Sequence, residues 1–133
     1  MRIVLDTNVL ISAFVFPGGA PEEVYRLVIK GQAELVTSRA LLAEFGRILT
    51  SKFGWQRDRV EEAVAQVVRI AEVVKPAEKL QVITADLSDN RVLEAALQGK
   101  VETVVSGDRH LLQLKSWKGI SFRSPSAFLT ALG

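Results

Sequence analysis

Chemistry in this sequence could come from four acidic side chains spread along the chain: Asp6, Glu44, Asp89 and Asp108. Asp6 and Asp108 each follow a short apolar run that is typical of a buried strand. The carboxyl ends of parallel strands meet at one edge of a sheet, so these two carboxylates come together if their strands are neighbours. Converging carboxylates repel one another by several kcal/mol at an effective dielectric constant of about 20, and they therefore either bind protons or hold a divalent cation.

The kind of ion follows from the ligand atoms. The four acids offer only carboxylate oxygens, and the sequence contains no cysteine. Hard oxygen ligands favour Mg²⁺ or Mn²⁺ over Zn²⁺. Such an ion retains several waters, one of which it could make acidic enough to attack a phosphodiester bond. If the acids converge, they predict phosphodiester hydrolysis.

Three of the four acids also have an ordinary structural interpretation. Asp6, followed by Thr7 and Asn8, suits the cap of a helix as well as it suits a metal ligand. Glu44 falls at the border of the apolar stripe of its helix, where a glutamate commonly extends to solvent. Asp89 lies on the core-facing stripe at the start of its helix, and capping of that helix would explain it.

Other residues receive structural interpretations. Asp86 and Glu94 are expected to be solvated, and His110 is interpreted as structural because it lies within a short helical pattern. Trp55 and Trp117 could stack on bases, although core or dimer contacts are the simpler explanation. Scattered cations could contact phosphates, although most surface cations only aid solubility: Arg39, Lys52, Arg57, Arg109, Lys115, Lys118 and Arg123.

The elements that would position these residues alternate along the chain. Short β-branched runs predict strands at residues 3–5, 34–37, 80–84, 102–105 and 120–122. Amphipathic patterns predict helices at residues 21–30, 38–52, 57–74, 89–97 and 109–114, with a final turn from Ser124. This order predicts an α/β fold in which helices flank a central, mostly parallel sheet of four to five strands.

Composition limits the alternatives. With 133 residues, 48% of them hydrophobic, the chain is expected to form one domain over residues 1–133. The absence of cysteine excludes disulfides, thiolate zinc sites and cysteine nucleophiles. A net charge of +2 is too small to indicate nucleic-acid binding alone. Asp6 and Asn8 interrupt the apolar N-terminal run, so we expect a cytoplasmic protein without a membrane segment.

Four segments resemble the PIN-domain pattern in order and spacing. They are Val-Leu-Asp-Thr-Asn-Val-Leu at residues 4–10, Glu44, Asp89-Asn90, and Val-Ser-Gly-Asp at residues 105–108. The likeness covers essentially the whole chain. It is greatest to compact bacterial and archaeal PIN proteins described as toxins of toxin–antitoxin modules, which are relatives of the VapC-type ribonucleases.

The resemblance implies a three-layer, Rossmann-like fold and cleavage of single-stranded RNA with Mg²⁺ or Mn²⁺. It also implies a homodimer or higher homo-oligomer, and a cognate antitoxin that blocks the site. The acidic metal-site roles would be taken by Asp6, Glu44, Asp89 and Asp108. Asn8 and Ser106 match small polar positions that orient the acids or water, and Ser106 keeps the hydroxyl of the commoner threonine.

Two alternatives remain. An aspartyl-nucleophile phosphatase also has an aspartate after its first strand. The pattern of that family has a second aspartate two residues later, where this chain has Asn8, and the chain has little room for a cap domain. A non-catalytic PIN-like module would bind RNA or protein without cleavage. The presence of all four acids argues against this second alternative, and a failure to bind Mn²⁺ would favour it.

Overall fold

The computed structural model describes residues 1–83 and 89–132. Strands and helices alternate along the chain in this order: β1 (Arg2–Leu5), α1 (Thr7–Val15), α2 (Ala20–Ile29), β2 (Glu34–Ser38), α3 (Arg39–Ser51), α4 (Arg57–Ile70), β3 (Ala71–Val74), α5 (Asp89–Gln98), β4 (Thr103–Val105), α6 (Arg109–Leu112), β5 (Ser116–Trp117), β6 (Ile120–Arg123) and α7 (Pro125–Leu132). None of the helices in the described part of the chain is long and apolar enough to cross a membrane.

The strands form one mixed, mostly parallel sheet in the order β3-β2-β1-β4-β6-β5, with only β5 antiparallel to its neighbour. The expected fold class is therefore confirmed. Within the described residues the sheet has six strands, where four to five were expected. β1 lies beside β4, and Leu5 pairs with Val105. The two strands that precede Asp6 and Asp108 are thus neighbours.

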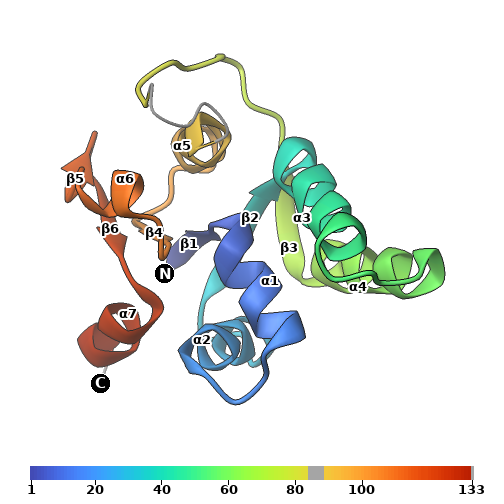
Figure 1. Ribbon diagram of the computed structural model, residues 1–133. Coiled ribbons are helices and arrows are strands. Elements are labelled where there is room, and N and C mark those ends of the chain that lie inside the picture. Colours follow the sequence, from blue (N-terminus) through green and yellow to red (C-terminus); the bar gives the residue numbers. More distant parts are fainter. Residues whose placement is uncertain (84–88, 133) are drawn as a thin grey trace.

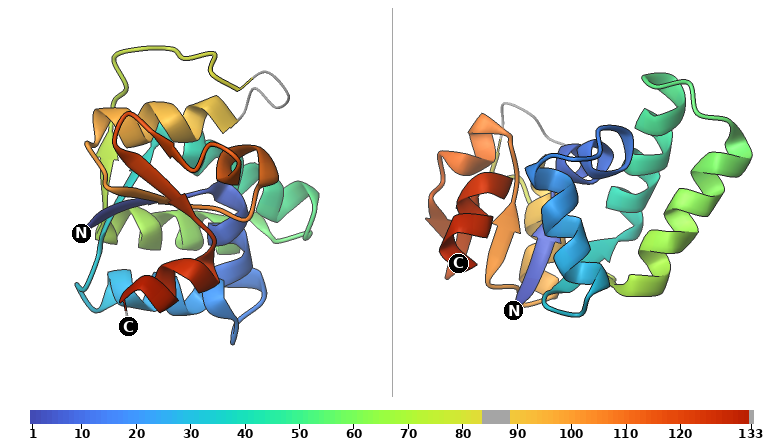
Figure 2. Two further views of the ribbon diagram at one scale, coloured as in Figure 1. Left: turned by 90° about the vertical axis from the view of Figure 1, so that its left-hand side faces the viewer. Right: turned by 90° about the horizontal axis from the view of Figure 1, so that it is seen from below.

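The sheet is covered on both faces because its central strands are apolar on both sides (Figure 1). In β1, Ile3 and Leu5 point to the face covered by α1, α2, α3, α4 and α7, whereas Val4 points to the face covered by α5. Figure 1 shows α5 on one side of the sheet and α2 and α7 on the other. The two views in Figure 2 show α3 and α4 side by side at the β3 edge.

Two expected elements are wrong. The helix expected at residues 57–74 ends at Ile70, and Ala71–Val74 form β3, because parallel pairing with β2 satisfies this backbone and suits the β-branched Val73 and Val74. The strand expected at residues 80–84 is not a strand over residues 80–83, and Thr84 lies outside the described residues. Side chains of α5 bind the backbone of this segment instead.

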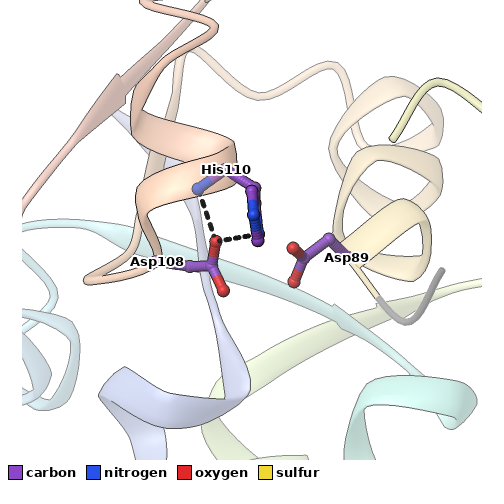
Figure 3. A group of neighbouring side chains, drawn as sticks. All are labelled: Asp89, Asp108 and His110. Carbon is purple, nitrogen blue, oxygen red and sulfur yellow. Dashed lines mark hydrogen bonds and ion pairs between the residues drawn. The ribbon is translucent and has the colours of Figure 1, made fainter. Parts of the chain in front are cut away.

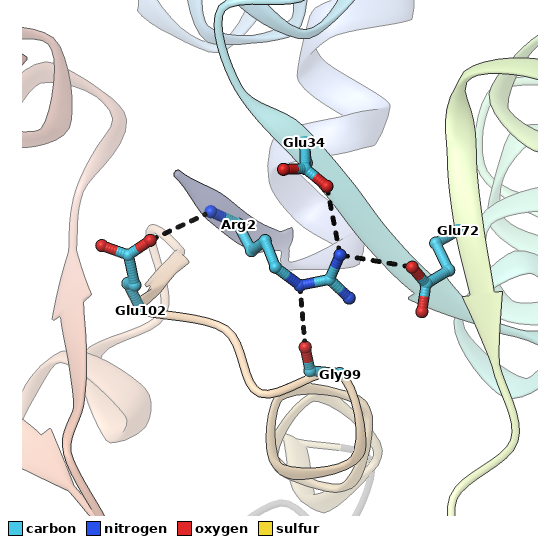
Figure 4. A network of polar contacts seen from close by, with 5 residues as sticks. All are labelled: Arg2, Glu34, Glu72, Gly99 and Glu102. Carbon is cyan, nitrogen blue, oxygen red and sulfur yellow. Dashed lines mark hydrogen bonds and ion pairs between the residues drawn. The ribbon is translucent and has the colours of Figure 1, made fainter.

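The edge of the sheet opposite the strand carboxyl ends is held by Arg2 (Figure 4). The Arg2 Nη1 atom lies 3.1 Å from Glu34 Oε2 and 3.2 Å from Glu72 Oε1, and Nε donates to the Gly99 carbonyl at 3.0 Å. The side chain of Arg2 is only 28% exposed. One guanidinium therefore joins β1, β2, β3 and the end of α5.

Candidate metal centre

Asp6 and Asp108 lie at the carboxyl ends of two adjacent strands. Asp6 directly follows β1, and its backbone N–H donates to the Val105 carbonyl of β4 at 2.9 Å. Asp108 comes three residues after Val105, at the cap of α6, where its Oδ1 accepts from the His110 N–H at 2.7 Å. The parallel pairing of β1 with β4 therefore brings these two acids to one edge of the sheet and meets the condition, neighbouring strands, on which the expectation from the sequence depended.

Ser106 connects the two acids. Its hydroxyl donates to Asp6 Oδ2 at 2.7 Å and accepts from the Asp108 backbone N–H at 2.9 Å. The serine is fully buried. It thus fixes the Asp6 carboxylate relative to the turn that carries Asp108, which is consistent with an orienting role.

Asp6 is a buried acid whose charge is disfavoured. Burial raises the pKa of its carboxyl from the ordinary 3.8 to about 6, against the lowering effect of the hydrogen bond from Ser106. The negative charges of Asp108 and Glu44 raise the pKa further. The Asp6 side chain does not cap α1 by a hydrogen bond, so the capping interpretation does not explain its burial.

Asp89, Asp108 and His110 form a compact group (Figure 3). One ligand atom from each lies within 4.8 Å of the other two. Asp89 begins α5 and is buried, and it approaches the space between α5 and α6 from the side opposite Asp108. The His110 Nδ1 lies 3.4 Å from Asp108 Oδ1. The histidine that was interpreted as only structural therefore lies within the candidate centre.

Glu44 and Asn8 lie at the margin of this group. Glu44 is on α3, and its side chain is 20% exposed with Oε2 4.0 Å from Arg47 Nη2. Its position at the border of the apolar stripe is as predicted, and its charge acts on the pKa of Asp6. Asn8 is exposed on the first turn of α1 and makes no side-chain hydrogen bond to any described residue. Its orienting role stays a prediction.

The expected solvation of Glu94 is wrong. Glu94 is buried, accepts from the Leu80 N–H at 2.7 Å and pairs with Arg91 at 2.8 Å. Asn90 is also fully buried, accepting from the Ile83 N–H at 2.8 Å and donating to the Ile83 carbonyl at 2.7 Å. These two α5 side chains bind the backbone of Leu80 and Ile83, and the helical periodicity alone did not indicate this. Asp86 lies outside the described residues.

A hollow of about 750 Å³ opens at the same sheet edge, between the start of α3, the residues after β3 and one side of α5. Its lining includes four cationic side chains, Arg39, Lys75, Lys79 and Arg91. Arg39 begins α3, the helix that also carries Glu44, and Arg91 belongs to the first turn of α5 after Asp89. The lining also includes Glu78 and Glu94, and Glu94 pairs with Arg91 at 2.8 Å. Arg39, Lys75 and Lys79 are therefore the cations of the hollow that form no ion pair with a described residue.

The aromatic side chains named from the sequence have core roles. Trp55 and Trp117 are partly buried, and each packs against one of the two apolar cores. The Arg59 guanidinium stacks 3.7 Å from the Trp55 ring centre, and Lys118 lies over Trp117. The structural interpretation of both tryptophans is therefore confirmed for this chain.

The residues present fit a divalent cation. Carboxylate oxygens of Asp89 and Asp108 lie close to each other and to His110. Asp6 and Glu44 are not part of that compact group, but the charges of Asp108 and Glu44 act on the pKa of Asp6. The pKa of Asp6 is raised by burial and by its acidic neighbours, and a bound cation would offset that unfavourable charge. The donor set is hard oxygen plus one imidazole nitrogen.

Comparison with known proteins agrees with the geometry. The chain is 26% identical over 119 residues to the uncharacterised protein MJ1680 of Methanocaldococcus jannaschii, a match that covers 86% of this chain and 76% of that protein. The crystal structure of VapBC2 from Rickettsia felis bound to a promoter DNA fragment is similar, with a TM-score of 0.64, 15% identity, and 93% and 98% of the two chains covered.

The structure of VapBC-1 from nontypeable Haemophilus influenzae has a TM-score of 0.62 at 18% identity, with 95% and 99% of the two chains covered. At these identities the structural matches show a shared fold. The family model described as PIN domain matches residues 2–110. This match runs from β1 to His110 and includes all four acids, and the chain belongs to the PIN-domain family.

Proposed function

We propose that the chain is a metal-dependent endoribonuclease that hydrolyses phosphodiester bonds of single-stranded RNA, as the toxin of a toxin–antitoxin pair. The observation that carries this proposal is the joining of Asp6 to the Asp108 turn by Ser106, with Asp89 facing Asp108 across the same site. Membership of the PIN-domain family and the fold shared with the VapBC proteins support it.

In this proposal the metal site consists of Asp6, Glu44, Asp89 and Asp108, and the ion is Mg²⁺ or Mn²⁺. When bound, the ion supplies Lewis acidity and offsets the negative charge of a phosphodiester. Asp6 is held in place by Ser106, and Asp108 is held by the His110 backbone N–H. Cations that line the neighbouring hollow, among them Arg39, would bind phosphates of the RNA on either side of the cleaved bond.

The test is cleavage of labelled single-stranded RNA by purified protein that has been separated from any antitoxin. We expect cleavage with Mg²⁺ or Mn²⁺, none after addition of EDTA, and none by Asp89→Asn. The exposed Asp58 begins α4 away from the acidic group, so Asp58→Asn is a matched control that should cleave normally. Cleavage that persists in Asp89→Asn would indicate a contaminating nuclease.

A lack of cleavage across varied RNAs, together with no Mn²⁺ binding by calorimetry, would favour the non-catalytic module. The antitoxin proposal is supported by the VapBC neighbours, whereas the oligomer proposal rests on the resemblance of the sequence to PIN-domain proteins. We propose a cognate antitoxin, a homodimer or higher homo-oligomer, and a cytoplasmic location where RNA is available. Light scattering after size-exclusion chromatography tests the oligomer, because a monomer mass would contradict it.

A further inference from the structure

We infer that His110 is a nitrogen ligand of the metal centre and makes it prefer a first-row transition-metal ion to Mg²⁺. This inference rests on the metal site proposed above and names its ion class. The side chain of His110 is 37% exposed, and its simplest alternative role is a surface contact with Asp108 alone. Three structural steps favour the ligand role.

The first step is the position of the ring. The backbone N–H of His110 donates to Asp108 Oδ1 at 2.7 Å, which fixes the start of α6 against that acid. The imidazole then lies between the carboxylates of Asp108 and Asp89, which reach it from α6 and α5 (Figure 3). A surface contact with Asp108 would not require the ring to face Asp89 as well.

The second step is the distance between donors. Ligand atoms bound to one ion at about 2.1 Å lie at most about 4.2 Å apart. The three donor atoms of Asp89, Asp108 and His110 lie within 4.8 Å of one another, so small side-chain rotations would bring them to one ion. A rotation of the His110 ring leaves the bond from the His110 backbone N–H to Asp108 Oδ1 in place, because this bond does not involve the ring.

The third step is the chemistry of the donors. Mg²⁺ is bound almost entirely by oxygen, whereas imidazole suits first-row transition-metal ions. A site of carboxylates alone would discriminate weakly between Mg²⁺ and Mn²⁺. One imidazole added to the carboxylates should therefore strengthen Mn²⁺ binding more than Mg²⁺ binding.

The direct test is pulsed electron paramagnetic resonance of Mn²⁺ bound to the full-length protein, without RNA and with any histidine tag removed. His110 is the only histidine of the sequence, so labelling with ¹⁵N-histidine changes one residue. We expect nitrogen modulation of the Mn²⁺ signal that shifts to ¹⁵N frequencies on labelling and disappears in His110→Ala. Bound Mn²⁺ without this modulation would overturn the inference.

Calorimetry with Mn²⁺ and with Mg²⁺ provides the second readout. We expect His110→Ala to weaken Mn²⁺ binding by about tenfold or more and Mg²⁺ binding much less. Gln113→Ala, an exposed change at the end of the same short helix, should leave both affinities unchanged. An equal loss of affinity for Mn²⁺ and Mg²⁺ in His110→Ala would overturn the inference without contradicting the metal centre itself. Failure of the wild-type protein to bind either ion would overturn the proposed metal dependence as well.

Discussion

The Ser106 hydroxyl donates to Asp6 Oδ2 at 2.7 Å, although the two residues are 100 positions apart in the sequence. The same oxygen accepts from the Asp108 backbone N–H at 2.9 Å. Since β1 and β4 are adjacent and parallel, a single buried hydroxyl can reach both turns that follow these strands. Ser106 therefore has a positioning role that can be tested separately from metal binding by the acids.

Replacing Ser106 by alanine should weaken the centre. The change removes the hydrogen bond that lowers the pKa of Asp6, so less of this carboxylate is ionised near neutral pH. We expect metal affinity and RNA cleavage to fall by about 10- to 100-fold, the usual range for residues that orient metal ligands. Ser106→Thr keeps the hydroxyl and should retain most of both. Equal losses in the two variants would show that packing at this buried position, and not the hydroxyl, is responsible.

Asp6 should make the metal-free protein less stable as the pH rises. The pKa is near 3.8 in the unfolded chain and about 6 in the folded one, so between these values the folded state holds more protons. The contribution of Asp6 to the unfolding free energy therefore falls by about 3 kcal/mol between pH 4 and pH 6, and it stays at the lower value above pH 6. In EDTA, Asp6→Asn should be more stable than the wild type at pH 8, by up to this amount.

Urea unfolding at several pH values measures the Asp6 effect. The stability advantage of Asp6→Asn should disappear near pH 4, where Asp6 is protonated in the folded protein. At pH 8 and saturating Mn²⁺ the wild type should be more stable than Asp6→Asn, because only the wild type retains the carboxylate ligand. A difference between the two proteins that is the same at every pH would contradict this explanation.

The positions of Asp6 and Asp108 after strands could be predicted from the local pattern, whereas the pairing of β1 with β4 that brings them together could not. An apolar run followed by an aspartate marks the end of a buried strand, and parallel strands place such ends at one edge. The position of His110 could not be predicted in this way. Its proximity to Asp89 depends on how α5 and α6 are placed relative to each other at the sheet edge, and no periodicity within either helix specifies that placement.

The errors in the fold have the same cause. Residues 71–74 continue an amphipathic helical pattern, and only pairing with β2 makes them a strand. Leu80 to Ile83 have the composition of a buried strand, but their backbone is bound by Glu94 and Asn90. Local sequence indicates the apolar and β-branched character of a segment, whereas tertiary contacts decide what satisfies its backbone hydrogen bonds.

The buried Asn90 should stabilise the segment that precedes α5. Its side chain satisfies both backbone groups of Ile83, so Asn90→Ala leaves a buried donor and a buried acceptor unpaired. At about 1–3 kcal/mol for each of the two groups, we expect a loss of about 2–6 kcal/mol in unfolding free energy. Gln98→Ala removes an exposed bond to the Ala77 N–H and should cost less than about 0.5 kcal/mol. Similar urea midpoints for the two variants would contradict this role.

Arg39 should contribute to RNA affinity through a phosphate contact. In an Asp89→Asn background that does not cleave, Arg39→Ala should weaken binding of single-stranded RNA and reduce the slope of log affinity against log salt by about 0.7. Lys30→Ala removes an exposed cation at the end of α2, outside the lining of the hollow, and should leave the slope unchanged. An unchanged slope in the Arg39 variant would exclude a phosphate contact by Arg39.

Gly99 permits the close approach of α5 to the sheet. A Cβ atom at this position would lie 2.5 Å from Val36 Cγ1 and 3.1 Å from the Ala95 carbonyl oxygen. Val36 is fully buried in β2, so the clash cannot be relieved by moving a surface side chain. We expect Gly99→Ala to lower the unfolding free energy by about 1–3 kcal/mol. Gly107→Ala adds a methyl group where no atom lies within 4 Å, and it should change stability little.

A double-mutant cycle separates the Gly99–Val36 clash from other effects of the new methyl group. Val36→Ala alone removes buried volume and should also destabilise the protein. In the double variant the new methyl group occupies space that the valine has left, so the combined loss should be smaller than the sum of the single losses. Additive losses would mean that Gly99→Ala acts through the backbone at the end of α5 instead of through Val36.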